Sequence, residues 1–180
     1  MKKTAALFVS FIIYSNLIQA QATYTPVDAS SKVHFVIKNF SIKTGGDFTG
    51  LKGTIKFDTE KFSTSFFDVT VDASTIDTDN SSRDGHLKKA EYFDVAVFKT
   101  LHFKSTKITK SSVTGRFFMY GNLTIKGKTK PIEFGFGAAP KQGGYVFDGE
   151  FTINRRDFGV GGSSVSMSDN LTVSLSVFAK

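Results

Sequence analysis

Three ionisable residues, Arg83, Asp84 and His86, lie close together in a stretch that differs from the rest of the chain. Arginine and histidine donate hydrogen bonds and a carboxylate can orient them, so this trio could form a polar rim that binds a head group. A helix beginning here would add N–H donors for a phosphate or a carbonyl oxygen. The alternative is structural, with Asp84 capping the helix and pairing with Arg83.

Metal-binding and catalytic alternatives are weaker. The histidines are His34, His86 and His102; no pair of them shows helical or strand ligand spacing, and the chain has no cysteine. A hydrolase would combine Asp84 and His86 with a serine in a motif such as G-x-S-x-G, which the chain lacks. We therefore expect no metal site, no cofactor and no enzymatic activity.

Most of the chain alternates apolar and polar residues one for one, the pattern of strands with one dry face and one wet face. Gly45-Gly46-Asp47 is interpreted as a turn, and 155–168 as a loop before the last strand. The expected strands are eight: 33–38, 51–58, 66–73, 101–106, 113–126, 131–138, 145–153 and 171–179.

Between the third and fourth of these strands the alternation stops. Leu87, Ala90 and Phe93 recur three apart, the spacing of a helical turn. We expect a short helical insertion there, carrying the Arg83, Asp84 and His86 trio.

Tight turns make neighbouring strands antiparallel, and eight such strands can close into an up-and-down barrel. The predicted fold is thus all-β, a single eight-stranded antiparallel barrel with one helical insertion. A two-sheet sandwich has the same periodicity and stays open as an alternative. Gly53, Gly115, Gly121 and Gly149 share the parity of the large apolar residues, where they either leave room or mark bends in the wall.

Phenylalanine is abundant: the chain has 20 Phe, 5 Tyr and no Trp. Phe carries no polar group, so a Phe-rich interior suits either a packed core or a cavity for a hydrocarbon chain. The candidate lumen-lining residues share the inward parity: Phe35, Phe57, Phe103, Phe117, Phe134, Phe136, Phe147 and Phe151.

The first residues read as an export signal. Lys2 and Lys3 precede an apolar run that ends at Ala20-Gln21-Ala22, so 1–22 is predicted to be a signal peptide cleaved after Ala20 or Ala22. The mature domain then spans 23–180, in the periplasm or secreted. The formal charge of +7 falls to +5 without the two lysines, and the remaining lysines are spread out, which disfavours nucleic-acid binding.

Six motifs follow one another along the chain: Ser74-Thr75-Ile76-Asp77-Thr78, Arg83-Asp84-Gly85-His86-Leu87-Lys88, Phe93-Asp94, Phe103-Lys104-Ser105-Thr106, the run 121–131, and Arg156-Asp157-Phe158-Gly159-Val160-Gly161. Together they resemble the YceI-like family of polyisoprenoid- and lipid-binding proteins. The likeness runs from about Tyr24 to the C-terminus.

The resemblance implies a lipocalin-like barrel, exported, that sequesters or transports a polyisoprenoid, an isoprenoid quinone or a fatty amide in its lumen. The tail would lie among the phenylalanines and the head group near Arg83, Asp84 and His86, while Leu87, Phe93, Phe158 and Val160 would form the mouth. Transient membrane contact and a monomer or homodimer are expected. The alternative is an exported stress-response or interaction protein with a closed core and no lipid.

Overall fold

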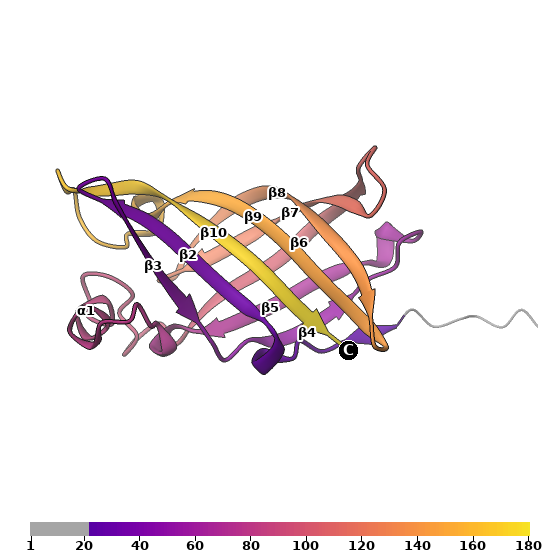
Figure 1. The fold of residues 1–180 in the computed structure, drawn as a ribbon, viewed down its shortest axis with the longest axis horizontal. Coiled ribbons are helices and arrows are strands. Elements are labelled where there is room, and N and C mark those ends of the chain that lie inside the picture. The colour runs from indigo at the N-terminus through magenta and orange to yellow at the C-terminus, as the bar shows by residue number, and fades with distance from the viewer. Residues whose placement is uncertain (1–21) are drawn as a thin grey trace, which may run out of the picture.

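The computed structural model describes residues 22–180, and the predicted signal peptide lies almost entirely outside them. Ten antiparallel strands form one strongly curled sheet, elongated along one axis (Figure 1). Around the sheet the order is β1-β4-β5-β6-β7-β8-β9-β10-β2-β3. The strands are β1 (Thr23–Tyr24), β2 (Lys32–Asn39), β3 (Ile42–Phe48), β4 (Lys52–Lys56), β5 (Phe66–Asp72), β6 (Thr100–Lys110), β7 (Arg116–Ile125), β8 (Lys128–Lys141), β9 (Gly144–Asn154) and β10 (Met167–Ala179).

The prediction of eight strands was wrong, because β1 and β3 were missed. β3 contains Gly45-Gly46, which lacks side chains to alternate and was interpreted as a turn. The glycines allow β3 to lie close to β2: a Cβ on Gly46 would meet the Phe35 ring at 2.7 Å. β1 has only two residues, too few to show a period.

The prediction of a closed barrel was also wrong. The edge strands β1 and β3 do not pair with each other, so the sheet is an open, curled half-barrel. Isolated bridges cross its seam at two places, Pro26 to Ala179 and Asp47 to Asp77. The segment beside β1 supports this seam, since Val27 N donates to Phe178 O at 2.8 Å and the Asp28 carboxylate accepts from Leu51 N at 2.8 Å.

The helical insertion lies between β5 and β6, but it is shorter and earlier than the apolar spacing indicated. α1 spans Ser81–Leu87, and Ala90 and Phe93 lie in the turns that follow. Asn80 sets the start, because its side chain accepts from Arg83 N at 3.0 Å. Single-turn 3₁₀ helices complete the chain: η1 (Asp28–Ser30), η2 (Phe62–Thr64), η3 (Ala73–Thr75) and η4 (Arg155–Phe158).

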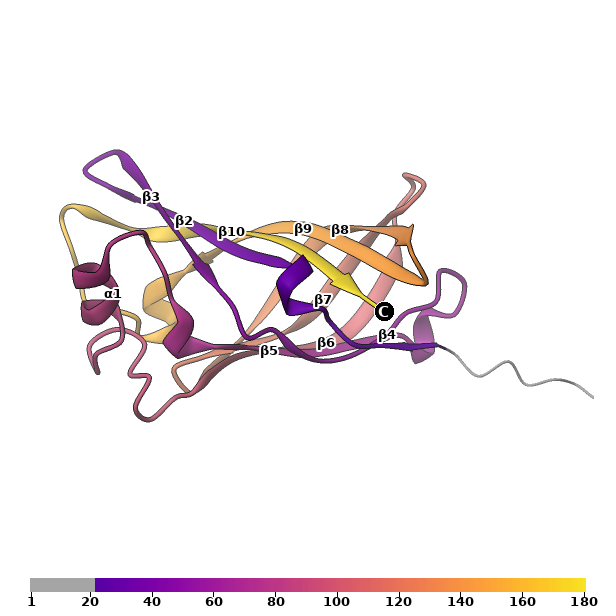
Figure 2. The same ribbon diagram turned by 60° about the horizontal axis from the view of Figure 1, so that its bottom comes forward.

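α1 lies at one end of the long axis, together with the β2–β3 turn and the 159–166 loop, while the C-terminus lies at the other (Figures 1 and 2). We call the α1 end the mouth and the opposite end the base. None of the helices in residues 22–180 has the length and apolar character needed to cross a bilayer.

Candidate functional site

An apolar cavity of about 250 Å³ occupies the mouth half of the sheet's interior. Strands from all round the sheet contribute to its wall, as do α1 and the turns after it. Aliphatic side chains make up much of the lining: Val33, Ile37, Leu51, Val69, Val71, Leu101, Leu123, Ile125, Ile153, Leu171, Val173, Leu175 and Val177. Such a surface offers an apolar ligand burial from water with little need for polar partners.

The eight phenylalanines proposed from the sequence divide into two groups. Phe35, Phe103, Phe134 and Phe151 line the cavity. The other four, Phe57, Phe117, Phe136 and Phe147, lie in the buried cluster at the base and do not line it.

The base is filled by ring-to-ring packing. Phe57 is 2% exposed, and its ring centroid lies 5.3 Å from Phe117 and 5.2 Å from Phe147. Both contacts are edge-to-face, the geometry that aromatic rings prefer. Phe57, which follows β4, meets rings from β5, β7, β8 and β9 at this level, and none of these rings lines the cavity. Burial also raises the pKa of the Tyr24 hydroxyl, with nearby Tyr145 and Asp58 adding to the effect.

Phe103 and Phe134 form the floor between the packed base and the cavity. Their centroids are 5.9 Å apart, and both pack against the base cluster while lining the cavity. Glycines seat the two rings: a Cβ on Gly121 would overlap the Phe103 ring, and one on Gly149 would meet Phe134 at 3.1 Å. The space beside these two glycines is thus filled by phenylalanine rings, and Gly121 also lies opposite an irregularity in the β6–β7 register between Ser105 and Lys107.

The four residues proposed for the mouth all line the cavity: Leu87, Phe93, Phe158 and Val160. Phe93 packs edge-to-face on Phe48 at 5.5 Å, which ties the turns after α1 to β3. Phe158 is 2% exposed and belongs to a cluster with Leu123 and Ile153.

A second set of contacts holds the two mouth segments together. The Glu91 carbonyl accepts from Gly161 N at 3.0 Å and from Lys126 Nζ at 3.1 Å. Lys126 also donates to Gly159 O at 2.9 Å. The turns after α1 and the loop after η4 are thus linked across the mouth by few polar contacts.

The proposed head-group trio is not brought together around one point. Arg83 lines the cavity, and its Nε donates to Thr78 Oγ1 at 2.7 Å. Asp84 accepts from the Thr78 amide and hydroxyl, so both residues act on Thr78. His86 is exposed and contacts the Tyr92 ring, with centroids 4.9 Å apart. The structural alternative is wrong about the cap, because Asn80 caps the helix, and the side chains of Arg83 and Asp84 both bind Thr78.

Sequence reasoning missed Arg155, a second cation at the cavity wall. Its side chain is 2% exposed and lines the cavity. It donates to the carbonyls of Ser168, Val160 and Gly162 and pairs with Asp169 at 2.8 Å. The signal available was an arginine at the end of an apolar strand face, continuing the inward parity of Phe151 and Ile153.

A group of charged side chains also lies on β5 and β6, two strands of the cavity wall. His102 Nε2 lies 2.7 Å from one Asp68 oxygen and Lys104 Nζ lies 3.0 Å from the other. The hydrogen bond from His102, followed by that from Lys104, lowers the pKa of the Asp68 carboxyl. Within residues 22–180, no three His, Asp or Glu side chains are grouped closely enough to hold a metal ion.

Comparison with known proteins gives a consistent set of relatives. A UPF0312 protein of Azotobacter vinelandii is 30% identical over 173 residues, covering 89% of this chain and 88% of that protein. Protein YceI of Salmonella newport is 32% identical over 135 residues, covering 71% of this chain and 70% of that protein.

Two solved structures share the fold. Burkholderia cenocepacia BcnA has a TM-score of 0.81 at 24% identity, covering 86% of this chain and 99% of that one. A polyisoprenoid binding domain from Saccharophagus degradans has a TM-score of 0.71 at 14% identity, covering 89% and 98%. The YceI-like domain model matches residues 24–179, which is nearly all of the described chain. Because that match spans most of the chain and the curled antiparallel sheet agrees with it, this chain belongs to the YceI-like family.

Proposed function

We propose that the protein is an exported carrier that binds the tail of a long-chain amphiphilic lipid in its mouth-side cavity. The candidate ligands are a polyisoprenoid, an isoprenoid quinone or a fatty amide. The observation that carries the proposal is the cavity of about 250 Å³ with an almost wholly apolar wall. For comparison, an apolar cavity of roughly 150 Å³ in another protein stays dry and takes up benzene.

Burial of the tail supplies the binding free energy in this account. Each methylene removed from water contributes about 0.8 kcal/mol, which is about fourfold in affinity. The cavity ends at the Phe103–Phe134 floor, so this gain should stop once the tail reaches it. Export, by way of the predicted signal peptide, would place the carrier in the periplasm or outside the cell as a monomer or homodimer.

The polar groups at the wall suit a head group held at the mouth. Arg83 and Arg155 both line the cavity, the first from α1 and the second from η4. Both guanidinium groups already have protein partners, so we expect them to orient a head group rather than to supply most of the affinity. The closed-core alternative, an exported stress or interaction protein without lipid, is supported by the base of the sheet alone.

Organic extraction of the purified protein followed by mass spectrometry tests the proposal. We expect one lipid per chain, and an affinity series of saturated alcohols should rise about fourfold per methylene and then level off. Val173→Phe places a larger side chain in the cavity, and this variant should contain less lipid than the wild type. A protein that is empty after purification and takes up no isoprenoid or fatty amide would support the closed-core alternative.

A further inference from the structure

The turn between β2 and β3 presents large apolar side chains to solvent at the mouth. Phe40 is 74% exposed and Ile42 is 70% exposed. Phe40 and Ser41 are the two central residues of this tight turn, and both have positive φ, 48° and 67°. Such turns normally carry Asn or Gly at these positions, and a bulky residue there is strained. The strained turn thus holds a phenylalanine that contributes little to the fold.

A neighbouring loop adds a third apolar side chain to the same rim. Val165 is fully exposed. The loop and the turn are joined, because Phe40 N donates to Ser166 O at 2.8 Å. We call Phe40, Ile42 and Val165 the rim triad.

Two lysines flank the turn, and their positions destabilise the pairing of β2 with β3. Lys38 and Lys43 are directly opposite each other in the β2–β3 ladder, and both are exposed. Like charges in this position destabilise a strand pair. Among residues 22–180, neither lysine has a carboxylate within ion-pair distance. Their uncompensated charge fits an anionic surface outside the protein.

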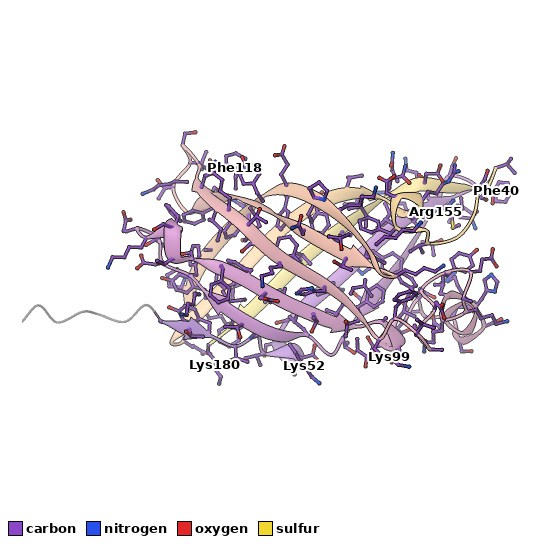
Figure 3. The ribbon with its side chains drawn as sticks, turned by 180° about the vertical axis from the view of Figure 1, so that it is seen from behind. Phe40, Lys52, Lys99, Phe118, Arg155 and Lys180 are labelled. Atoms are coloured by element: carbon purple, nitrogen blue, oxygen red, sulfur yellow. The ribbon has the colours of Figure 1, made fainter. Side chains whose placement is uncertain are left out.

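The rim triad adjoins the cavity. Asn39 and Met167 line the cavity, and each is next in the chain to a residue of the Phe40–Ser166 hydrogen bond. Figure 3 shows Phe40 at the mouth, on the same side as Arg155, while Phe118 lies at the opposite end of the long axis. A surface that binds the rim triad would therefore face the cavity mouth.

We propose that the rim triad and the two lysines dock the mouth onto a lipid bilayer that contains anionic lipids. The apolar side chains would enter the boundary between head groups and acyl chains, and Lys38 and Lys43 would lie among the phosphates. This docking rests on the proposed function, because it gives a lipid tail a route between bilayer and cavity without crossing water. A second copy of the chain fits less well, since a two-fold contact at this turn would set lysines against lysines.

Sedimentation with phosphatidylcholine vesicles, with and without phosphatidylglycerol, tests the docking surface. The combined variant Phe40→Ser, Ile42→Ser and Val165→Ser should lower vesicle partitioning by at least about tenfold. Val113→Ser combined with Phe118→Ser removes exposed apolar side chains elsewhere, and this control should partition as the wild type does. The double variant Lys38→Gln and Lys43→Gln should lower vesicle partitioning by about fivefold per lysine, and only on vesicles with phosphatidylglycerol.

Equal partitioning of the triad variant and the wild type, or no partitioning of either, would overturn the docking proposal. Analytical ultracentrifugation tests whether a second copy of the chain binds the rim triad instead. A wild-type dimer that the triad variant abolishes would assign this surface to that second copy. Lipid content after extraction separates docking from lipid binding. The triad variant should keep its bound lipid, whereas a lipid-free protein that still partitions would refute the proposed function and leave docking standing.

Discussion

The base and the mouth half of the same sheet use inward-facing phenylalanines in opposite ways. At the base, Phe57 and the rings around it meet at one level and pack against one another. In the mouth half the inward positions are mainly aliphatic, and a cavity of about 250 Å³ stays between them. The number of phenylalanines therefore says less about binding than the level at which their rings meet.

Truncating the base should have the largest effect on stability. Phe57→Ala removes a ring that is 2% exposed and packed against five others, so we expect a loss of about 3–5 kcal/mol in the free energy of unfolding. Phe35→Ala is the matched change in the mouth half, and we expect roughly half that loss because its ring borders existing space. Urea titrations of both variants measure the difference, and equal losses would erase the contrast between the halves.

Arg155 tests how far the mouth depends on one buried cation. Arg155→Met leaves three carbonyls without their donor, and it leaves Asp169 with only the hydrogen bond from Arg156 at 3.3 Å. Because Asp169 is partly exposed and can be rehydrated, we expect a loss of about 2–3 kcal/mol. Arg156→Met, at the exposed partner of the same aspartate, should lose less than about 0.5 kcal/mol. Unfolding titrations would contradict this account if the two variants were alike.

Larger side chains should affect the two halves of the interior differently. Ile55→Phe overfills the base and should lower stability by about 1–3 kcal/mol. In Val173→Phe the new ring enters the cavity, so we expect the free energy of unfolding to fall by less than about 1 kcal/mol, together with a clear loss of bound lipid. Thermal unfolding and lipid extraction on the same samples give both quantities. An Ile55→Phe variant that keeps its stability but binds less lipid would show that the lipid site lies at the base and not in the mouth half.

The smallest effect concerns Asp68 on the wall. Its pKa is lowered from 3.8, chiefly by the hydrogen bond from His102 and then by Lys104. A carboxyl with a lower pKa in the folded state adds stability above its unfolded pKa, and this contribution is lost as pH falls through the folded value. Asp68→Asn should therefore be less stable than the wild type by under about 1 kcal/mol near neutral pH, and equally stable in strong acid. A stability difference that grows towards acid would contradict this sign.

Alternation along the chain was enough to predict an all-β antiparallel fold, eight of the ten strands and an insertion before β6. It could not reveal β3, because Gly45 and Gly46 have no side chains whose pattern could be detected. It also could not show that the sheet stays open, since closure depends on how β1 and β3 lie in space.

The site was harder to predict than the fold for a similar reason. Parity along a strand assigns a residue to the inner face but not to a level along the barrel axis. Phe57 and Phe35 therefore looked equivalent, although one is in the base and the other lines the cavity. The cluster of charge at Arg83, Asp84 and His86 was visible in the sequence. That Arg83 and Asp84 share Thr78 as a partner, and that Arg155 lines the same cavity, depends on tertiary contacts.

Methyl NMR of the protein titrated with a polyisoprenoid alcohol tests most directly whether a lipid tail binds in the mouth-side cavity. We expect intermolecular NOEs from the tail to Leu123, Leu171 and Val173 in the cavity. We expect none to Ile55 and Ile108 in the base. NOEs to the base methyls, or a titration that perturbs neither set, would contradict a cavity that ends at the Phe103–Phe134 floor.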